Sequence, residues 1–464
     1  MTDWCPDLTS SNAPRYLAIA ERIEADVISG QLNAGDRLPA QRELASKLGL
    51  DFTTVARGYA EARRRGVVSS QVGSGTYVTH QAEDQNNNAA RTNSPRTCPP
   101  DHSMNLPPEP HDPALVSRMQ RGLAELSADL VPLLRYQNLE ASETDRQAAM
   151  TWLKRAKLSA DAEKIIFSPG AQAALAGILA TLARPGKCIA CEAITYPGIR
   201  SLCAQTGIEL IGLKTDDDGI DPEAFQSACE AKQLRALYVN PTLNNPTTRT
   251  VPTHRRSEIV AIAQKFGVPI LEDDAYGHLM PDAPPPFATI APDITWYIGS
   301  LSKTLGSGLR LAYIQAPNKS ASWTASRALR TANVTPSPLT VALATRWIED
   351  GTADELLSFA RRDSAARQSI ATEQLSGLKI CTDPSAFHLW LELPAGWTRS
   401  IFVSQMRHQQ IGIVESDAFT VAGTPEEAVR ICLGGPTGHT QLGNSLDVIA
   451  QTLRNTPQSA SAFF

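Results

Sequence analysis

One lysine, Lys303, stands in a short stretch whose composition suggests amine chemistry. Residues 300–310 read SLSKTLGSGLR and follow an apolar run that ends at Ile298. An amine can condense with a carbonyl group, and glycines followed by an arginine can hold a phosphate. The same stretch could equally be a surface loop with a solvated lysine. The choice depends on whether the other parts of such a site occur elsewhere in the chain.

The segments around this stretch predict that it lies at the edge of a sheet. From about residue 111 onward, short apolar runs alternate with patterns of helical spacing. This alternation predicts an α/β fold with a mostly parallel sheet covered by helices on both faces. Ligands of such sheets bind beyond the carboxyl ends of the strands, so we expect the residues after each run to share one crevice. The strand-like runs are 164–167, 188–190, 208–213, 236–239, 269–271, 296–298 and 311–314.

Several runs are followed by residues that suit an anion, an aromatic ring and an amide contact. Gly170, Ala171 and Gln172 follow the first run, and a glycine there leaves the N–H groups of the next helix facing an anion. Tyr196 places an aromatic ring where it can stack on a planar ligand. Asn245 places an amide at a rigid turn. None of these features indicates a ligand by itself.

Three consecutive carboxylates at 272–274 end another run, and Tyr276 follows them. Buried carboxylates are costly without partners, and a protonated pyridine nitrogen would be such a partner. Arg310 lies seven residues after Lys303 and can bind a phosphate through two parallel hydrogen bonds. These residues add a cation and an acid to the same predicted crevice.

Each of these residues also has an ordinary structural explanation. Tyr196 could belong to the core, Asn245 to a turn, Asp273 to a helix cap and Arg310 to an ion pair. Their occurrence together beyond successive strands favours a pyridoxal phosphate site instead. Lys303 would form the Schiff base, and a carboxylate would hold the pyridinium. Burial and nearby cations would favour the neutral amine that this chemistry needs.

The part of the chain from residue 111 onward resembles the fold-type I aminotransferases over most of its length. The resemblance implies that Lys303 forms the aldimine, that Asp273 pairs with the pyridine nitrogen and that Tyr196 stacks on the ring. It implies that Asn245 and Tyr276 contact the ring hydroxyl. It also implies that the phosphate is held by Gly170, Ala171, Gln172, Ser300, Ser302 and Arg310.

Two further residues are assigned by the same resemblance. Tyr136 matches the tyrosine that reaches the phosphate of the neighbouring subunit, and Arg430 matches the arginine that binds a substrate carboxylate. The sequence departs from the family pattern at three places. Ala171 stands where a hydroxyl residue is common, Ser307 replaces a proline, and the glycine usual after Tyr136 is absent. None of these departures removes the lysine chemistry.

The first part of the chain predicts a separate helical unit. Apolar residues recur at helical spacing over 16–28, a short helix follows at 41–48, and a third begins at 51 and ends near 65. Two short helices joined by a tight turn at Gly49 make a helix-turn-helix. The segments 67–68 and 77–78 flank a Gly-Ser-Gly sequence and predict a β-hairpin wing.

Charge within this unit is compatible with DNA binding. Residues 36–80 carry seven Lys or Arg against four acidic residues, a local charge of +3, although the whole chain carries −5. Charge alone would favour a simpler explanation, in which the arginines at 63–65 solvate a helix end. Thr53 and Thr54 favour DNA, because they begin the third helix, the end of a recognition helix that meets the major groove.

Residues 16–78 closely resemble the GntR-type winged helix. The matching positions include Gly35-Asp36-Arg37-Leu38-Pro39, Thr53-Thr54-Val55 and Gly73-Ser74-Gly75-Thr76-Tyr77-Val78. By this resemblance the candidate DNA contacts are Arg37, Arg42, Thr53, Thr54, Arg57 and, at the wing tip, Gly75.

The composition sets the limits of this interpretation. We predict a winged-helix domain over 11–80, a flexible linker rich in proline and polar residues over 81–110, and an aminotransferase-like domain over 111–464. No apolar run approaches the length of a membrane helix, and the first residues do not resemble a signal peptide. The eight scattered cysteines predict reduced thiols in a cytoplasmic protein, with no metal site.

A GntR-type winged helix followed by an aminotransferase-like domain is the layout of the MocR family of bacterial regulators. The resemblance implies a transcription factor that binds operator DNA, carries pyridoxal phosphate at Lys303 and senses an amino compound. It also implies a homodimer in which each winged helix reaches over the partner subunit. One alternative is an aminotransferase with an accessory DNA-binding domain. Another is a pyridoxal phosphate protein without a DNA role.

Overall fold

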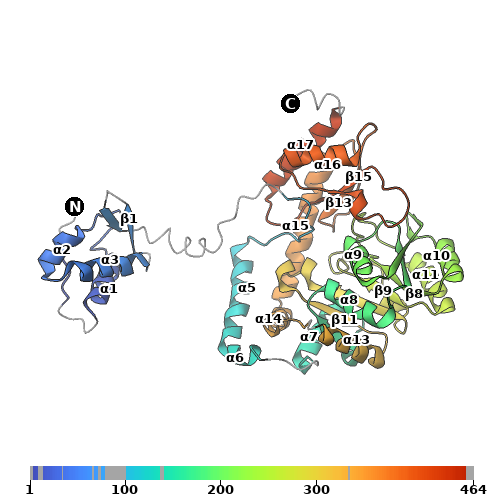
Figure 1. The fold of residues 1–464 in the computed structure, drawn as a ribbon, viewed down its shortest axis with the longest axis horizontal. Coiled ribbons are helices and arrows are strands. Elements are labelled where there is room, and N and C mark those ends of the chain that lie inside the picture. Colours follow the sequence, from blue (N-terminus) through green and yellow to red (C-terminus); the bar gives the residue numbers. More distant parts are fainter. Residues whose placement is uncertain are drawn as a thin grey trace. The chain divides into compact units, whose positions relative to one another are not determined.

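The chain folds into two compact units, Met1–Cys98 and Pro99–Phe464 (Figure 1). The computed structural model describes residues 4–8, 14–33, 35–64, 67–71, 75–78, 101–135, 141–332 and 335–455. Among these residues, none of the helices is both long and apolar enough to cross a membrane.

The first unit is a winged helix-turn-helix, as predicted. Its elements are α1 (Arg15–Ile28), α2 (Gln41–Leu48), α3 (Phe52–Arg64), β1 (Val68–Gln71) and β2 (Gly75–Val78). Helix α2 ends at Gly49, which adopts the left-handed conformation that glycine tolerates. The two strands form an antiparallel hairpin. Ile19, Ile23, Leu44 and Val55 are fully buried between the three helices.

A short segment before the first predicted helix also belongs to this unit. Trp4 and Leu8 are buried in the same core. The indole N–H of Trp4 donates to Asp26 Oδ2 at 2.8 Å, and Arg15 donates to the carbonyl oxygen of Leu8 at 2.9 Å. The folded unit therefore includes residues that precede the predicted boundary at 11.

The second unit is organised around a seven-stranded sheet. Its strands lie in the order β3-β11-β10-β9-β8-β4-β5. Only β11 runs antiparallel to its neighbours, so the predicted mostly parallel sheet is confirmed. The seven strands coincide with the seven predicted runs: β3 (Ile165–Ser168), β4 (Cys188–Glu192), β5 (Glu209–Leu213), β8 (Leu234–Val239), β9 (Ile270–Asp273), β10 (Thr295–Ser300) and β11 (Ala312–Gln315).

Helices cover both faces of this sheet. One face packs on α8 (Ala171–Leu182), α9 (Pro197–Thr206) and α13 (Lys319–Thr331). Part of the other face packs on α10 (Pro222–Ala231), α11 (Thr253–Phe266) and α12 (Phe287–Ile290). A small hairpin of β6 (Thr215–Asp216) and β7 (Gly219–Ile220) precedes α10.

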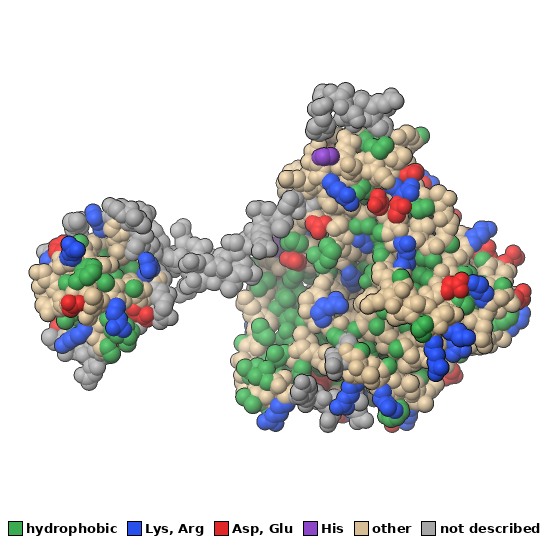
Figure 2. Space-filling model, in the orientation of Figure 1, with side chains coloured by type: hydrophobic (Ala, Val, Ile, Leu, Met, Phe, Trp, Pro, Cys, Tyr) green, Lys and Arg blue, Asp and Glu red, His purple; other side chains and the backbone are tan. Residues whose placement is uncertain are grey.

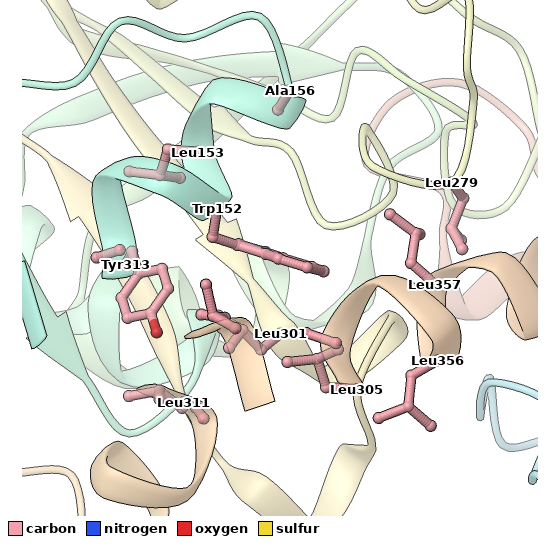
Figure 3. Packing of buried hydrophobic residues seen from close by; sticks show 14 of the residues in the cluster. Trp152, Leu153, Ala156, Leu279, Leu301, Leu305, Leu311, Tyr313, Leu356 and Leu357 are labelled. Atoms are coloured by element: carbon pink, nitrogen blue, oxygen red, sulfur yellow. The ribbon is translucent and has the colours of Figure 1, made fainter. Parts of the chain in front are cut away.

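A third core joins this second face to helices that come before and after the sheet strands in the sequence. It includes residues from α5 (Pro113–Leu126), α7 (Glu143–Arg155), α14 (Pro338–Glu349) and α15 (Thr352–Gln374). Figure 3 shows Trp152 in this core beside Leu301 and Leu305, with Tyr313 of β11 nearby. The short α6 (Leu130–Leu133) follows α5.

The C-terminal part forms a smaller α+β subdomain. Its antiparallel sheet has the order β12-β13-β15-β14, with β12 (Lys379–Cys381), β13 (His388–Glu392), β14 (Val414–Glu415) and β15 (Ala428–Cys432). The sheet shares a core with α16 (Arg399–His408), α17 (His439–Arg454) and the end of α15. The fold is therefore that of a fold-type I aminotransferase, as the sequence predicted.

The predicted flexible linker over 81–110 is wrong for residues 101–108, and residues 81–100 lie outside the part of the chain that the structure describes. Asp101 forms a parallel bridge with Gly412, and Pro108 forms one with Gly435. Between them, the backbone N–H of Cys432 donates to the carbonyl oxygen of His102 at 2.8 Å. Backbone pairing of this kind does not depend on side-chain hydrophobicity, so composition could not reveal it. We call residues 101–108 the strap.

Candidate cofactor site and DNA-binding surface

Lys303 lies directly beyond the carboxyl end of β10, where the sequence placed it. It ends a single 3₁₀ turn that begins at Leu301. Leu301 and Leu305 are buried in the core shown in Figure 3, and they fix the loop on either side of the lysine. The hydroxyl oxygen of Ser300 accepts from the backbone N–H of Ser302 at 3.2 Å, which caps the turn.

The amino group of Lys303 is partly removed from water. Its Nζ donates to the backbone carbonyl oxygen of Asn105 in the strap. The pKa of Lys303 is lowered to about 8, mainly by burial; the cations of Arg430 and Arg310 act in the same direction, whereas Cys432 and Asp273 oppose the shift. A lysine with that pKa is about one tenth neutral at pH 7, far more than an ordinary lysine.

The three consecutive carboxylates are separated by the alternation of the strand. Glu272 accepts from the backbone N–H groups of Phe287 and Ala288, at 2.8 and 2.9 Å, and lies 3.5 Å from the buried guanidinium of Arg256. Asp274 accepts from the hydroxyl of Tyr297 through Oδ2 at 2.9 Å, while its Oδ1 has no partner among the described residues. The alternation of the strand places Asp273 on the opposite face from Glu272 and Asp274.

Asp273 is buried and only half satisfied. Its Oδ2 accepts from the hydroxyl of Tyr238 at 2.9 Å, while its Oδ1 has no hydrogen-bond partner in the described part of the chain. Asn240 donates to the Asp273 carbonyl oxygen at 2.6 Å and holds the backbone. Burial raises the pKa of Asp273 to about 6, although the Tyr238 hydrogen bond lowers it. A buried acceptor that has no donor in the protein is available to accept a hydrogen bond from a ligand.

Gly170 and Arg310, which the sequence predicts to hold a phosphate, lie against each other at the same edge and are called the phosphate seat. Strand β11 is antiparallel, so Arg310, just before its first residue, lies at the edge where the other strands end. Gly170 has φ +94° at the start of α8, and a β-carbon there would lie 3.0 Å from Arg310 Nη2. The arginine has no hydrogen-bond or ion-pair partner among the described residues. The glycine thus admits a free cation beside a helix N-terminus.

The remaining predicted phosphate residues lie around this seat. Ala171 is the first residue of α8, and Gln172 donates to the carbonyl oxygen of Gly198 at 3.0 Å. The hydroxyl group of Ser307 donates to the Ser302 carbonyl oxygen at 3.2 Å, so the serine in the place of the usual proline ties the loop to itself.

Tyr196 immediately precedes α9, and its ring packs over Gly198. A β-carbon at Gly198 would lie 2.2 Å from the Tyr196 ring, so only glycine permits this position. Burial raises the pKa of Tyr196, and Asp273 adds to the shift. The predicted stacking ring and the predicted pyridine partner are therefore close enough to affect each other's ionisation. We call the cluster of Lys303, Tyr196, Asp273, Tyr276 and Arg430 the chamber.

Arg430 is buried on β15 and lies at the same chamber. Its Nη1 donates to Asn245 Oδ1 at 2.9 Å, and its Nη2 donates to the carbonyl oxygen of Ser103 in the strap. The guanidinium lies over the Phe419 ring at 5.0 Å, and its Nε has no partner in the described residues. A buried cation whose hydrogen bonds all go to neutral acceptors favours an anionic ligand.

Tyr276 completes the chamber and reveals residues that the sequence did not indicate. Its hydroxyl accepts from Asn105 Nδ2 at 2.8 Å, and Lys303 Nζ lies 6.0 Å from its ring centroid. Asn105 and His388 carry no motif, because a strap and an antiparallel strand reach the site only through tertiary packing. Tyr238 could have been found, because the alternation of β8 places it on the face that carries Asp273.

The prediction that Tyr136 reaches the phosphate of the neighbouring subunit is not tested, because Tyr136 lies outside the residues that the structure describes. No group of three potential metal ligands occurs among the described residues, and the seven cysteines that the structure describes are free thiols.

The candidate DNA contacts lie on the first unit. Thr53 is exposed at the start of α3, where its N–H and hydroxyl both donate to Asp51 Oδ1. These hydrogen bonds lower the pKa of Asp51 and cap the helix. Thr54 is half-buried one residue later. The N-terminus of α3 is thus ordered and accessible.

The predicted arginines differ in their surroundings. Arg42 is exposed on α2, with its guanidinium 5.9 Å from the Phe52 ring, and Arg57 lies 4.3 Å over the Tyr16 ring. Arg37 bridges to Tyr77 of the wing, and a β-carbon on Gly75 would lie 2.7 Å from its Nε. The wing tip and Arg37 therefore form one surface.

The chamber residues fit pyridoxal phosphate. Asp273 Oδ1 lacks a donor, Arg310 lacks an anion beside a glycine cradle, and Lys303 has a lowered pKa. These are the complements of a pyridinium N–H, a phosphate and an aldehyde.

Comparison with known proteins agrees with this architecture. The sequence pattern of aminotransferase class I and II matches residues 106–442, and that of the bacterial regulatory proteins of the gntR family matches residues 15–78. The chain therefore belongs to the aminotransferase class I and II family, whose members use pyridoxal phosphate. Its two domains together have the MocR-type layout.

Proteins similar to this chain are named as transcriptional regulators. The uncharacterised HTH-type transcriptional regulator YdeF of Bacillus subtilis (strain 168) is 28% identical over 456 residues, covering 97% of this chain and 96% of YdeF. The HTH-type pyridoxine biosynthesis transcriptional regulator PdxR of Corynebacterium glutamicum is 29% identical and covers 65% of this chain and 66% of PdxR.

Solved structures share the fold of the second unit. LysN, the α-aminoadipate aminotransferase of Thermus thermophilus, superposes with a TM-score of 0.69 at 20% identity, covering 76% of this chain and 92% of LysN. That structure was solved with N-(5'-phosphopyridoxyl)-L-leucine.

Proposed function

We propose that the protein is a DNA-binding regulator that carries pyridoxal phosphate at Lys303 and senses a primary amine that also bears an anionic group. The observation that carries this proposal is the pairing of a winged helix with a chamber that holds a lysine of lowered pKa, a half-satisfied Asp273 and a buried Arg430. Such a regulator acts in the cytoplasm.

The chain offers a partner for each part of the cofactor. Asp273 would accept from the ring nitrogen, Tyr196 would cover the ring, and Asn245 and Tyr276 would face its hydroxyl. The phosphate would meet Arg310, Ser300, Ser302 and the start of α8 with Gly170, Ala171 and Gln172. When bound, pyridoxal phosphate supplies an aldehyde that exchanges one primary amine for another. Tyr136 of the partner subunit is proposed to complete the phosphate seat.

Arg430 and the strap support sensing. The guanidinium now donates to two neutral oxygens, Asn245 Oδ1 and the Ser103 carbonyl. A ligand carboxylate is a stronger acceptor and would displace one or both. An incoming amine would likewise replace Lys303, which now donates to the Asn105 carbonyl. Two of these three contacts, those with the Ser103 and Asn105 carbonyl oxygens, lie in the strap. The strap continues the chain segment after the winged helix, so we propose that ligand binding shifts the strap.

The decisive experiment measures operator binding and cofactor state together. Holo-protein should show a visible absorbance band, and an amine that changes this band should change operator affinity in the same concentration range. Loss of the band without any change in operator affinity would contradict sensing. Operator DNA can be taken from the region upstream of the gene, with a shuffled duplex as control.

A second copy of the chain is the proposed partner of α5 and α6. Leu123, Leu130, Val131 and Leu134 expose between 42% and 66% of their surface. Figure 2 shows hydrophobic side chains gathered over these helices. Exposed apolar side chains in such number indicate an interface. We propose a homodimer with exchanged winged helices, and Val131→Asp with Leu134→Asp should yield a monomer in sedimentation experiments.

The alternative function is that of an aminotransferase with an accessory DNA-binding domain. It is favoured by the completeness of the chamber, since Lys303, Asp273 and Arg430 are all in place. A steady-state assay with amino donors and keto acids decides between the two. Turnover of about 1–10³ per second would favour the enzyme, whereas single turnover with ligand-dependent operator binding favours the regulator.

A further inference from the structure

Asn105 connects three groups at the wall of the lysine chamber. It is 9% exposed, and its carbonyl oxygen accepts from Lys303. Its side-chain Nδ2 lies 2.8 Å from the Tyr276 hydroxyl and 3.4 Å from Nδ1 of His388. His388 is fully buried on β13 and belongs to no motif identified in the sequence.

The proton positions in this series of hydrogen bonds follow from its last contact, between His388 and Asn244. His388 Nε2 lies 3.1 Å from the carbonyl oxygen of Asn244, which can only accept, so Nε2 carries the proton. Burial lowers the pKa of His388 to about 3, so the ring is neutral and Nδ1 is an acceptor. Asn105 must then turn its NH₂ group, and not its oxygen, toward His388.

The same NH₂ group faces Tyr276. Both of its protons are therefore assigned, one to His388 and one to the Tyr276 oxygen. An inverted amide would place two acceptors, the Asn105 oxygen and His388 Nδ1, against each other. Because the tyrosine oxygen accepts from Asn105, its own proton is free for another acceptor.

We propose that His388 and Asn105 are positioning residues that direct the hydroxyl proton of Tyr276 toward the ring oxygen of bound pyridoxal phosphate. The inference rests on the proposed function, because it requires that cofactor. Neither residue touches the reacting atoms through its side chain; both act through Tyr276. A donated hydrogen bond stabilises the anionic ring oxygen, and this lowers the pH at which the lysine-bound cofactor changes colour.

Other groups near Tyr276 also influence that transition, so variants must be compared in one background. The charged and titratable groups around Tyr276 are Asp273, Arg430, Cys432, Tyr196, His388 and Lys303. Substitution of Asn105 replaces none of these residues, but a carboxylate at position 105 adds its own charge beside His388 and Lys303.

The test is a pH titration of the visible absorbance of the holo-protein. Asn105→Asp places a carboxylate acceptor beside Tyr276, which would take the hydroxyl proton away from the cofactor. The transition should move upward by roughly one pH unit. His388→Leu frees the Asn105 amide to turn over and should move the transition in the same direction. His388→Gln, which keeps an acceptor and a donor, should restore it.

A double-mutant cycle with Tyr276→Phe distinguishes an effect that acts through the Tyr276 hydroxyl from a direct electrostatic effect of the new carboxylate on the cofactor. If Asn105 acts through Tyr276, Asn105→Asp should shift the transition less in the Tyr276→Phe background than in the wild type. An equal shift in both backgrounds, or wild-type transitions in Asn105→Asp and His388→Leu, would overturn the inference. If Asn105→Asp fails to fold, His388→Leu and His388→Gln decide alone. A wild-type protein that gives no visible band with pyridoxal phosphate would instead refute the proposed function.

Discussion

The surface proposed for DNA and the chamber proposed for the cofactor are built in opposite ways. The candidate DNA contacts fall within 37–75, and Arg42, Thr53 and Arg57 are exposed side chains. The chamber draws Asn105, Asp273 and Arg430 from three distant segments, and all three are buried. The first site depends on local helix geometry, whereas the second depends on how the two subdomains and the strap pack together.

This difference predicts how each site responds to substitution. An exposed residue that contacts phosphate contributes modestly, and water can replace its partner. A buried polar residue leaves an unpaired partner when it is removed, so its loss costs more. Substitutions in the chamber should therefore have large effects on the cofactor, and substitutions on the winged helix should have smaller, salt-dependent effects on DNA.

Substitution of the lysine should have the largest effect. Lys303→Ala removes the only amine that we assign to the cofactor, so the visible band should be absent and borohydride should not fix pyridoxal phosphate to the protein. Operator binding by the cofactor-free protein should be unchanged. Lys319→Ala, on the exposed surface of α13, is the matched control and should keep the band. An unchanged spectrum in Lys303→Ala would refute the assignment.

Asp273→Asn tests the ring partner. The amide keeps the size of the side chain but loses the charge that would pair with the pyridinium, so cofactor affinity should fall roughly 10²-fold or more. Equilibrium dialysis with pyridoxal phosphate measures this change. Asp274→Asn is the control, because that acid is bonded to Tyr297 instead. It should lower thermal stability while leaving cofactor affinity nearly intact.

Arg42→Ala tests the exposed surface. Loss of the Arg42 guanidinium should weaken operator binding about tenfold at low salt. The slope of log affinity against log salt concentration should fall by about one, and the cofactor spectrum should not change. Lys47→Ala removes an equal charge from the same helix at a position that we do not assign to DNA. If both variants weaken binding equally, then net charge and not a specific contact explains the affinity.

The difference between local geometry and tertiary packing also explains how much of the fold and the site could be predicted from the sequence. All seven strands of the large sheet could be predicted, because apolar runs between helical patterns leave few other topologies. Lys303 and Asp273 could be predicted to meet, because the edge of a parallel sheet collects residues that follow its strands. Arg310 reaches the same edge for another reason, since it precedes the antiparallel β11. The strap could not, because its contacts with Cys432 and Gly435 are backbone hydrogen bonds. Its polar, proline-containing composition predicted a linker.

The pH dependence of the rate at which Lys303 reacts with pyridoxal phosphate tests whether its amino group is shielded from water. Only the neutral amine attacks an aldehyde, and burial lowers the pKa of Lys303 to about 8. The capture rate should therefore rise about tenfold per pH unit below pH 8 and level off above it. Stopped-flow absorbance at constant ionic strength measures the rate. A rate that still rises steeply above pH 9, as for a free lysine, would show that water reaches the amine.

Arg430→Gln provides the smallest and most specific effect. The Arg430 cation contributes to the lowered pKa of Lys303, so its removal should raise that pKa and move the plateau to higher pH by a fraction of a unit. Arg407→Gln, an exposed arginine on α16, should leave the profile unchanged. Because the two variants change net charge equally, a shift confined to Arg430→Gln would show that this cation and Lys303 share one chamber.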